Sequence, residues 1–523
     1  MSRVAIVGSG MVGANLALEF ARRGHDVTVF EKGPDYPYPH EPQFLARIRY
    51  DYVDPRWEIG RDLRHTLSTG HYARDLTDEA VMVVGGAATR WTGLTMRMSP
   101  HDFRTKSVFG YGTDWPLGYD ELEPWYCAAE ARIGVSGTDA DNPWAPPRSK
   151  PYPLPPFEMT WDDRVLAERL ERAGIHIHTT PQARTRKAYD GREACMNFDA
   201  CDFCPIGARY SPTHHLERAK ATGRCTVRSD VSVRRVLADA AGRARALVCR
   251  PNRGERDFEH AADLVIVAGG AFESARLLLL STDARHPDGL GNTTGHLGRH
   301  LVFHHIWSGH LHFREHLYPG RAGFWTGQSE QFCNPPTRGR HGGIKVEFPA
   351  SPSPGHRQAA GDAESLAAAL TAFEPSRRCR RVAIHAESVP GDGKRIVLSK
   401  RRDRFGDPRV EVHYDFDDFD HATYDFGRAL YQRIAQGTGA YEWSYRDLAD
   451  FGTFAHHMGG CRMSEKPADG VTDPFGEVHG VPGLYVLGLS VFASAGGALN
   501  PTITALALAL RSADRMLERL GPA

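Results

Sequence analysis

Two histidines and an asparagine near the end of the chain carry side chains suited to acid–base chemistry. His456 and His457 are adjacent in HHMGGCRM, and Asn500 follows in ALNPT. An imidazole can take a proton near neutral pH, and an amide N–H can stabilise negative charge growing on an oxygen atom. These groups would suit removal of an alcohol's hydroxyl proton while a second group accepts the hydride. Taken singly, a histidine is more often structural and an asparagine before proline more often belongs to a turn, so the surrounding elements must decide.

Three cysteines form a second group with potential chemistry. Cys195, Cys201 and Cys204 lie in CMNFDACDFCPIG, and their C-x-x-C ending could bind iron or zinc or act as a redox dithiol. The spacing lacks an obvious fourth ligand, and Pro205 favours a loop over the helix that a redox C-x-x-C would open. Buried thiols often behave as small apolar residues. We expect a structural role and no metal, with an iron–sulfur cluster as the alternative.

The other histidines do not show the spacing of a metal site. The adjacent pairs at 214–215 and 304–305 have no carboxylate or thiolate at ligand spacing in the sequence. We interpret them as surface or cleft residues.

The start of the chain predicts a nucleotide-binding unit. An apolar strand over 4–7 is followed by GSGMVG, the helical run ANLALEFARRG and a second strand, DVTVF, which ends at Glu31. Gly8, Gly10 and Gly13 would let the backbone turn tightly and approach a pyrophosphate, whose charge the helix N-terminus would bind. Glu31 could accept hydrogen bonds from ribose hydroxyls. This unit indicates a dinucleotide but does not distinguish FAD from NAD.

Length and charge narrow the class of protein. A chain of 523 residues exceeds the size at which one core stops growing, so two joined domains are expected. Its 64 Lys and Arg balance 64 Asp and Glu, so no overall field would favour nucleic acid or an anionic membrane. No stretch approaches the roughly 20 apolar residues of a membrane-spanning helix, and the opening MSRVAIVGSG leaves no room for a secretion signal. We expect a cytoplasmic protein that acts on a small molecule.

The motifs along nearly the whole chain resemble those of the glucose-methanol-choline (GMC) oxidoreductases. The branch most similar contains pyranose oxidase, bacterial glycoside 3-oxidases and the large subunits of gluconate and fructose dehydrogenases. The resemblance rests on GSGMVG, VGGAATRWTGLTMR, YDELEPWYCAAEARIG, CMNFDACDFCPIGARYS, DLVIVAGGAFESARLLLLS, GHLGRHL and the block that begins at His456. In this family the C-terminal block folds back beside the isoalloxazine ring, which implies FAD as the cofactor. Related dehydrogenase subunits carry an iron–sulfur cluster in the region of the cysteines.

The resemblance also implies the architecture. We expect an α/β fold in which a Rossmann-like FAD-binding domain of the GMC and p-hydroxybenzoate hydroxylase type joins an antiparallel-sheet substrate-binding domain. The FAD-binding domain would be discontinuous, comprising residues 1–36, 80–100, 225–302 and 453–523. Residues 101–224 and 303–452 would form the substrate-binding domain and connecting segments. Within them GGIKVEF, RRVAIHAES, KRIVLS and PRVEVHYDF alternate apolar and polar residues, which predicts an antiparallel sheet along one wall of the site.

By similarity, His456 aligns with the catalytic base of the pyranose-oxidase branch, and Asn500 aligns with its partner. The assignment of His456 rests on its offset from Arg462 and Met463. His457 is the competing residue and a candidate substrate contact.

The resemblance also assigns residues to the cofactor. Pyranose oxidases can carry a histidine linked to the flavin one residue before the tryptophan of the corresponding segment, where this chain has Arg90. A guanidinium cannot form that bond, so the FAD should be non-covalent. The residues expected at the cofactor are Gly8, Gly10, Met11, Val12, Gly13, Glu31, Gly85, Gly86, Arg90, Thr92, Gly93, Val231, Ala268, Gly269, Gly488, Leu489, Asn500, Pro501 and Thr502.

Together these inferences predict FAD-dependent oxidation of a hydroxyl group on a sugar, glycoside or sugar-containing small molecule. His456 would take the proton and flavin N5 the hydride, with dioxygen or another acceptor reoxidising the flavin. An alcohol dehydrogenase of natural-product biosynthesis, acting for example on an aminoglycoside, is the alternative with the same chemistry. An FAD-containing lyase or a non-redox binding protein is the alternative of a different class, which the pairing of His456 with Asn500 disfavours.

Overall fold

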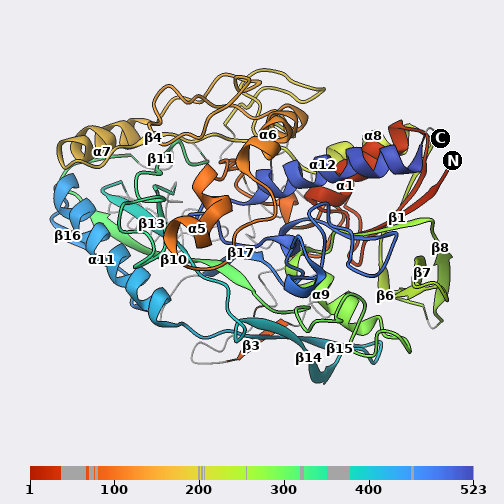
Figure 1. The fold of residues 1–523 in the computed structure, drawn as a ribbon. Coiled ribbons are helices and arrows are strands. Elements are labelled where there is room, and N and C mark those ends of the chain that lie inside the picture. Colours follow the sequence, from red (N-terminus) through yellow and green to blue (C-terminus); the bar gives the residue numbers. More distant parts are fainter. Residues whose placement is uncertain are drawn as a thin grey trace, which may run out of the picture.

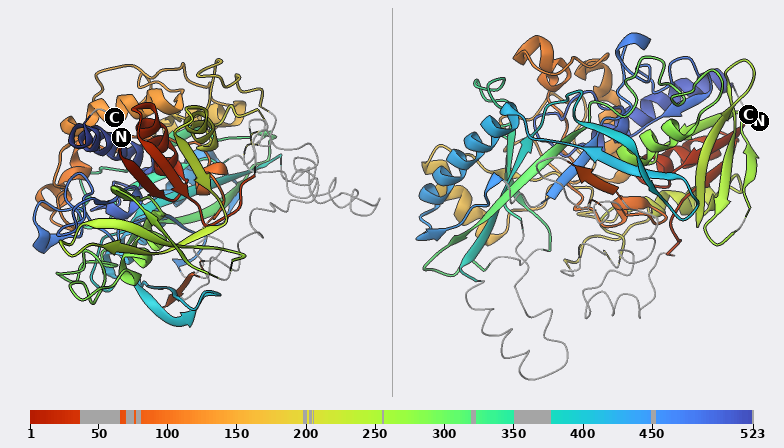
Figure 2. Two further views of the ribbon diagram at one scale, coloured as in Figure 1. Left: turned by 90° about the vertical axis from the view of Figure 1, so that its right-hand side faces the viewer. Right: turned by 90° about the horizontal axis from the view of Figure 1, so that it is seen from below.

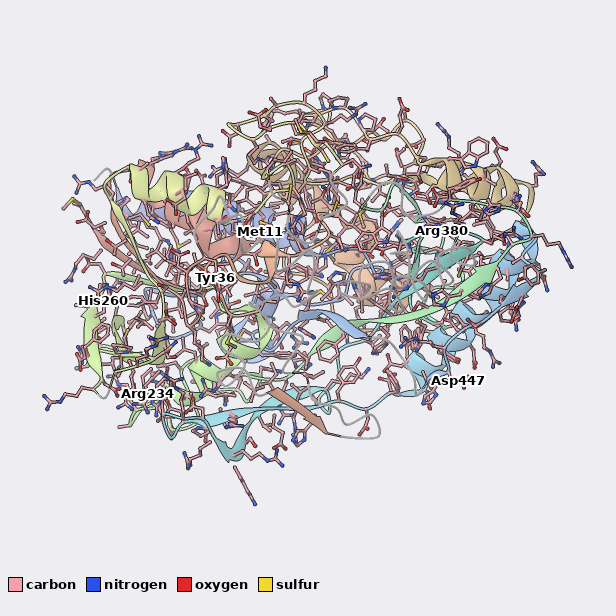
Figure 3. All side chains as sticks on the ribbon, turned by 180° about the vertical axis from the view of Figure 1, so that it is seen from behind. Met11, Tyr36, Arg234, His260, Arg380 and Asp447 are labelled. Carbon is pink, nitrogen blue, oxygen red and sulfur yellow. The ribbon has the colours of Figure 1, made fainter. Side chains whose placement is uncertain are left out.

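The fold was analysed in a computed structural model, which describes residues 1–36, 66–69, 76, 81–197, 201, 204, 206–254, 256–318, 323–349, 377–448 and 453–521. A parallel sheet lies at one end of the molecule and a larger antiparallel sheet at the other, and the N- and C-terminal ends lie side by side (Figures 1 and 2). Side chains fill the body between the two ends, with His260 labelled toward one end and Arg380 toward the other (Figure 3). None of the helices in these ranges is long and apolar enough to cross a membrane.

The parallel sheet has five short, apolar strands. In spatial order they are β18 (Leu484–Val486), β9 (Leu264–Val267), β1 (Arg3–Val7), β2 (Asp26–Phe30) and β5 (Cys225–Arg228). Every residue of β9 is buried, as expected for a parallel strand covered on both faces. The sheet draws its strands from both ends and the middle of the chain, so it positions distant loops along one edge.

Helices cover one side of this sheet and a smaller sheet covers the other (Figure 1). The helix α1 (Met11–Arg22) packs against α8 (Thr213–Ala221) and against α12 (Thr502–Leu520), and α6 (Tyr119–Ile133) packs against α12. The smaller sheet is antiparallel and consists of β6 (Val231–Ala238), β7 (Ala244–Pro251) and β8 (Phe258–Ala261). The short motif LYV forms β18, and the apolar run after Pro501 forms α12.

The second large sheet is antiparallel and has seven strands. Its main path is β16 (Glu442–Trp443), β10 (Val302–His312), β13 (Cys379–Glu387), β12 (Ile344–Glu347), β11 (Gly327–Ser329) and β4 (His178–Thr179). β17 (Thr453–Met458) pairs with β10 and carries the two adjacent histidines into this sheet. α11 (Asp418–Thr438) packs against β13 and against α7 (Trp161–Arg172). The predicted fold class, a Rossmann-like domain with an antiparallel-sheet domain, is confirmed.

The remaining elements are short. They are α5 (Thr105–Phe109), α9 (Gly270–Leu280), η2 (Gly86–Thr89), η3 (Pro100–Arg104), η6 (Pro467–Asp469) and η7 (Leu489–Val491).

Two strands predicted for the wall of the site lie elsewhere. β14 (Arg395–Arg402) and β15 (Pro408–His413), which contain RIVLS and PRVEVH, form a separate sheet with β3 (Thr66–Thr69). Both contact α9, on the side of the parallel sheet. Period-two alternation indicates that a strand has one buried face but not which layer covers that face, and here the layer is α9.

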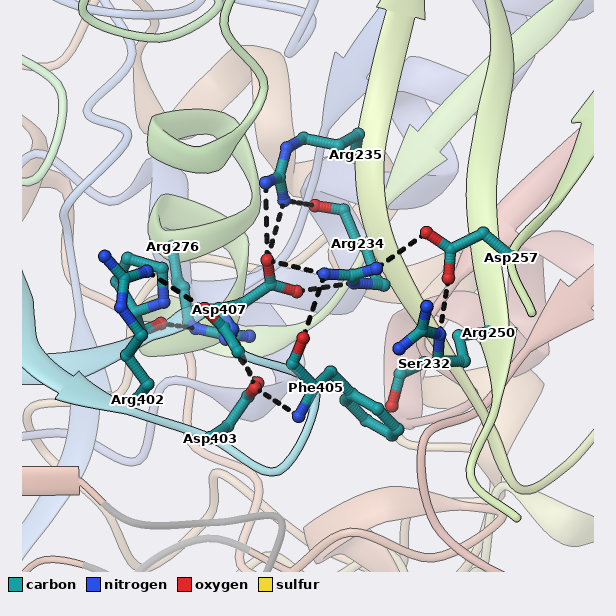
Figure 4. A network of polar contacts seen from close by, with 12 residues as sticks. Ser232, Arg234, Arg235, Arg250, Asp257, Arg276, Arg402, Asp403, Phe405 and Asp407 are labelled. Carbon is teal, nitrogen blue, oxygen red and sulfur yellow. Dashed lines mark hydrogen bonds and ion pairs between the residues drawn. The ribbon is translucent and has the colours of Figure 1, made fainter. Parts of the chain in front are cut away.

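An ion-pair network holds the hairpin between β14 and β15 against β6 (Figure 4). Asp407 in that hairpin is 3% exposed and accepts hydrogen bonds from Arg234 Nε at 2.6 Å and from Arg235 at 3.3 Å. Arg276 of α9 donates to Asp403 at 2.8 Å and to the carbonyl of Pro408 at 2.8 Å. The charged side chains come from β6, from α9 and from the hairpin itself. The network therefore holds the sheet of β14, β15 and β3 on the side of the molecule that carries the parallel sheet.

We predict that Asp407→Asn destabilises the protein, because a buried carboxylate that binds two guanidinium groups is replaced by a neutral amide. The expected loss in the free energy of unfolding is about 2 kcal/mol. The matched control is Glu259→Gln, whose exposed ion pair with Arg245 is 3.4 Å long, and its loss should stay within about 0.5 kcal/mol. Urea unfolding followed by fluorescence measures both, and equal losses would contradict the prediction.

Candidate active site

The loop after β1 has a shape that only glycine allows at two positions. Gly8 adopts a φ of +99°, and a Cβ there would lie 2.5 Å from the carbonyl oxygen of Ala268. A Cβ on Gly13 would lie 1.9 Å from the carbonyl oxygen of Gly8. At Gly10, which precedes α1, a Cβ would meet no described atom within 4 Å. The N–H groups of Met11 and the residue after it begin α1 beside this open space, which fits a diphosphate group.

Glu31 follows β2 and lies beside the same loop. Its carboxylate accepts hydrogen bonds from the hydroxyl of Ser9 at 2.6 Å and from the backbone N–H groups of Ser9 at 3.1 Å and Gly33 at 3.0 Å. Burial raises the pKa of Glu31, while these hydrogen bonds oppose the rise. Val231 donates its N–H to the carbonyl of Glu31 at 3.0 Å. The structure therefore brings Glu31 and Val231 together next to the glycine loop.

A second glycine segment contacts the first. Gly85 donates its N–H to the hydroxyl of Ser9 at 3.0 Å, and a Cβ on Gly86 would lie 3.2 Å from the Cα of Gly10. The backbone at 85–86 therefore passes directly over the loop that follows β1.

The chain after this contact is held by a residue that the sequence did not single out. Arg209 donates to the carbonyl of Thr89 at 2.7 Å and to the carbonyl of Trp91. Arg90 follows η2, and Thr92 and Gly93 continue the same loop. The sequence around Arg209 gives no signal of this role, because the carbonyls that the arginine binds are far away in the chain.

The other residues expected at the cofactor lie at neighbouring strand and helix ends. Ala268 and Gly269 follow β9, and Gly488 and Leu489 follow β18. A Cβ on Gly488 would lie 3.7 Å from the side chain of Val12 in α1, and Pro501 and Thr502 begin α12. The carboxyl ends of parallel strands are where such sheets bind ligands, and these segments gather there.

His456 is tied to a buried histidine on the neighbouring strand. Its Nδ1 lies 2.8 Å from Nδ1 of His304, whose Nε2 lies 2.6 Å from the carbonyl oxygen of Ala495. A carbonyl oxygen only accepts, so Nε2 of His304 carries a hydrogen. Burial lowers the pKa of His304 to about 3, which keeps this ring neutral and leaves a lone pair on its Nδ1. His456 must then donate from Nδ1, and its own Nε2 keeps the lone pair.

Asn500 faces that lone pair with a fixed orientation. Its amide nitrogen lies 3.3 Å from Nε2 of His456, and its amide oxygen accepts a hydrogen bond from the ammonium of Lys345. Lys345 also donates to Glu347 at 2.5 Å, and the other oxygen of Glu347 lies 2.9 Å from Nε2 of His385. An ammonium group only donates, so the amide oxygen has to face Lys345 and the NH₂ group has to face His456.

The protonation states in this cluster follow from burial. Burial lowers the pKa of His456 well below its usual range, and nearby His304, His385 and Lys345 lower it further. Burial also lowers the pKa of His385. Burial opposes ionisation of Glu347, but His385 and Lys345 outweigh it and hold its pKa below the usual range. At neutral pH the imidazole of His456 is therefore neutral, and Lys345 and Glu347 form an ion pair next to Asn500.

His457 points to the other face of β17. Its ring centroid lies 4.4 Å from that of Phe272 and 5.0 Å from that of Phe303, between layers of the core. The ring of His456 instead contacts that of His304, and the backbone between these neighbours is irregular, with a φ of +57° at His456. The candidate role of His457 as a substrate contact stays a prediction.

The turn that carries Ala495 and Asn500 rests on a buried charge cluster. Arg338 pairs with Asp102 at 2.7 Å and with Glu387 at 2.8 Å, and all three side chains are fully buried. A Cβ on Gly497 would lie 3.1 Å from the carboxylate of Asp102, so the turn lies directly on this cluster. Ser494 adds a hydrogen bond to the carbonyl of Asp102 at 3.2 Å.

The three clustered cysteines do not form a metal-binding set among the described residues. The Sγ of Cys204 accepts the backbone N–H of Arg209 at 3.4 Å, so this segment supports the arginine that holds the loop at 89–91. Burial raises the pKa of the Cys201 thiol to about 11. The structural role expected for the segment stays a prediction.

The sequence missed His304, Lys345, Glu347 and His385. Lys345 and Glu347 are two residues apart in GGIKVEF, which places both on one face of β12, but a strand of this kind usually turns its charges to solvent. The expectation that the pair at 304–305 lies at a surface or cleft is wrong, because both side chains are fully buried in β10. These residues are buried because seven strands pair into one sheet, and the sequence near each residue does not show that pairing.

The pair at 214–215 also differs from the expectation. His215 is fully buried, and Asp190, distant in the sequence, brings a carboxylate to within 3.3 Å of His214. The sequence could not show this contact because a turn before Arg192 and the start of α8 meet only in space.

Two family models of the GMC oxidoreductases match the chain, an N-terminal one over residues 158–306 and a C-terminal one over 392–509. A model of FAD-dependent oxidoreductases matches residues 3–40, which include the glycine loop and Glu31. The chain belongs to the GMC oxidoreductase family. This GMC protein is an FAD-dependent oxidoreductase, as the resemblance predicted.

Relatives of known activity span nearly the full length of this GMC oxidoreductase. It is 27% identical to the fructose dehydrogenase large subunit of Gluconobacter japonicus, over 99% of this chain and 98% of the relative. It is 28% identical to the 6'''-hydroxyparomomycin C oxidase of Streptomyces lividus, over 99% of this chain and 91% of the relative. Among solved structures, pyridoxine 4-oxidase from Mesorbium loti has the same fold, with a TM-score of 0.64 at 17% identity over 98% of this chain and 99% of the other.

We predict that the FAD is released when the protein is denatured. Arg90 stands where a histidine would be needed for a covalent link, so acid precipitation should leave a colourless pellet and a yellow supernatant. Absorbance of the two fractions at the flavin maximum measures this. A yellow pellet that survives washing would contradict the prediction.

Proposed function

We propose that this GMC oxidoreductase oxidises a hydroxyl group of a sugar, glycoside or sugar-containing small molecule, with His456 as the base. The observation that carries the proposal is the hydrogen-bond chain from the carbonyl of Ala495 through His304 to His456. This chain leaves the lone pair of His456 on Nε2, beside the amide of Asn500. A structural histidine has no need of a fixed lone pair next to a fixed donor.

In the proposed reaction the substrate hydroxyl lies between His456 and Asn500. Nε2 of His456 accepts the hydroxyl proton, and its Nδ1–H keeps its hydrogen bond to His304, so the ring does not have to rotate. The NH₂ group of Asn500 donates to the substrate oxygen while negative charge grows on it. When bound, FAD supplies the acceptor for the hydride that leaves the carbinol carbon.

The residues that would hold the cofactor come from the segments gathered at the end of the parallel sheet. The N-terminus of α1 at Gly10 would bind the pyrophosphate, and Glu31 would accept hydrogen bonds from the ribose in place of Ser9. Val231 would lie near the adenine. The loop at 85–93 and the turn before Pro501 would contact the flavin ring.

Two observations support a substrate with many hydroxyl groups. The groups behind the proposed base and its partner are polar and charged, namely Lys345, Glu347 and His385, which suits a hydrogen-bonding ligand better than an apolar one. Relatives along the whole chain include a fructose dehydrogenase and oxidases named for paromamine and hydroxyparomomycin. Those names also support an aminoglycoside as the second candidate substrate.

Anaerobic titration of the purified protein tests the proposal directly. Sugars, glycosides and aminoglycosides are added in turn, and loss of the oxidised flavin absorbance identifies a substrate. Bleaching by an aminoglycoside but by no simple sugar would favour the second candidate. Failure of every polyol, with rapid bleaching by a simple apolar alcohol, would overturn the sugar assignment. Readmission of air, compared with addition of a quinone, then identifies the acceptor that reoxidises the flavin.

We predict that His456→Ala slows flavin reduction by a factor of about 10² to 10⁴, since a general base is removed. Bound FAD should remain, because His456 does not support the nucleotide loop.

In the unaltered enzyme the rate of flavin reduction should stay high as pH falls through 6.5, the usual histidine pKa, and decline only at lower pH. Stopped-flow reduction across pH measures both effects. The matched control is His457→Asn, which should keep most of the reduction rate, and a larger loss in this control would reverse the assignment.

We predict that Lys345 acts as a positioning residue through Asn500 and through its charge near His456. In the double variant Lys345→Met, Glu347→Gln the amide of Asn500 loses its orienting donor, and flavin reduction should slow by about tenfold to a hundredfold. Lys345 lowers the pKa of His456 more than Glu347 raises it, so removing both charges should still raise this pKa and move the acid limb of the rate profile slightly to higher pH.

The matched control for Lys345 is Lys394, another buried lysine, which pairs with Asp420 at 2.7 Å away from the site. Lys394→Met should lower stability and leave the pH profile in place. If both lysine variants shift the profile alike, the positioning role of Lys345 is wrong.

A further inference from the structure

A cluster of two histidines and an aspartate lies on the flank of the nucleotide domain, away from the site described above. His214 and His215 stand in the first turn of α8, and Asp190 lies in a turn with a φ of +50°. One oxygen of Asp190 lies 3.3 Å from Nε2 of His214 and 3.7 Å from Nε2 of His215. All three ligand atoms lie within 4.8 Å of one another, and among the described residues no other set of His, Cys, Asp or Glu does so.

One nitrogen of His215 is held by hydrogen bonds and the other faces the cluster. Asn15 of α1 uses its amide NH₂ to donate to the carbonyl of Met11 at 2.8 Å and to the hydroxyl of Tyr210 at 2.9 Å. Nδ1 of His215 lies 2.8 Å from the amide oxygen of Asn15 and 2.8 Å from the hydroxyl of Tyr210. These contacts hold the ring so that Nε2 points toward Asp190, at 3.7 Å.

Nε2 of His215 faces the carboxylate of Asp190 in a buried place. This nitrogen has no hydrogen-bond partner among the described residues, and the carboxylate oxygen lies 3.7 Å away. A buried polar atom without a partner is unfavourable, and a cation between the imidazole nitrogen and the carboxylate would bind both.

Positive side chains surround the cluster and oppose a cation. Arg218 pairs with the same oxygen of Asp190, and Arg22 and Arg132 line an adjoining cavity of about 440 Å³. Arg218 is partly exposed and also lines this cavity, so its guanidinium has room to leave the carboxylate. A bound ion would therefore replace Arg218 at Asp190.

We propose that Asp190, His214 and His215 form a binding site for a first-row divalent transition metal ion such as Zn²⁺, with Arg218 occupying the carboxylate when the ion is absent. Two imidazoles and one carboxylate suit such an ion and leave positions for water. The hydrogen bond from Nδ1 of His215 to Asn15 supplies the outer support that metal-binding histidines usually have.

The position of the site gives the ion a structural role. Asn15 links His215 to Met11, the first residue of α1, through its hydrogen bonds to both. The ion would fasten the turn at Asp190 to α8, which packs on α1. It should therefore stabilise the nucleotide domain without touching the groups that carry out the oxidation.

The test uses the FAD-containing protein after treatment with EDTA. Zn²⁺ is added, unbound metal is removed by gel filtration, and bound zinc is counted by mass spectrometry. The unaltered protein should retain one more equivalent of zinc than Asp190→Asn or His214→Gln, and zinc should raise its unfolding temperature by a few degrees more than theirs. Asparagine tolerates a positive φ, so Asp190→Asn should keep the turn. Equal zinc content in all three proteins would overturn the proposal.

Two further variants separate a metal site from an ordinary ion-pair network. Arg218→Gln removes the competing cation and should tighten zinc binding by about tenfold. The matched control is His286→Gln, which breaks a surface pair of histidine and aspartate with a 2.9 Å contact, and it should leave zinc binding unchanged. If Arg218→Gln weakens zinc binding, or if His286→Gln lowers the zinc content as much as His214→Gln does, the assignment to this cluster is wrong.

Discussion

The hydrogen bond from Nε2 of His304 to the carbonyl of Ala495 determines the chemistry available at the site. A backbone carbonyl can only accept, and this one faces a ring that burial keeps neutral. The hydrogen positions on His304 and His456 follow from it in turn, and the second ring is left with its lone pair toward Asn500. One backbone atom therefore selects the tautomer of a side chain two residues further along the hydrogen-bond chain. The strands β10 and β17 and the turn before Asn500 all have to be in register for this to happen.

The turn itself depends on charges that cost free energy to bury. Arg338 lies with Asp102 and Glu387 in a place closed to water, and such a cluster is favourable only when every hydrogen bond is made. Tyr111 completes it by accepting a hydrogen bond from Nε of Arg338 at 2.9 Å. A cluster of this kind tolerates few alternative arrangements, which suits a turn that must hold a carbonyl and an amide at fixed positions. We infer that rigidity, more than stability, explains its presence under Gly497.

Much of the nucleotide side could be predicted because its signals are local. The glycines after β1, the alternation of strand and helix, and Pro501 at the start of α12 each indicate the structure of the segment in which they lie. The partners of His456 could not be predicted in this way. His304, Lys345 and His385 come from three strands whose order in the sheet is set by long-range pairing, and a lysine in β12 resembles an ordinary solvent-facing residue. The prediction that β14 and β15 line the site was wrong for the same reason. Alternation of apolar and polar residues shows that a strand has a buried face but not which element covers that face.

The strand order of the parallel sheet has a consequence for how the protein is made. β1 lies between β2 and β9, and β9 pairs on its other edge with β18, which comes from the last part of the chain. During synthesis the first strands emerge long before β18 exists, so this edge of β9 stays open until residues 484–486 have been made. The antiparallel sheet is likewise incomplete until β17 has been made. Because β17 precedes β18 in the chain, the antiparallel sheet can close first, and the parallel sheet keeps an open edge for longer.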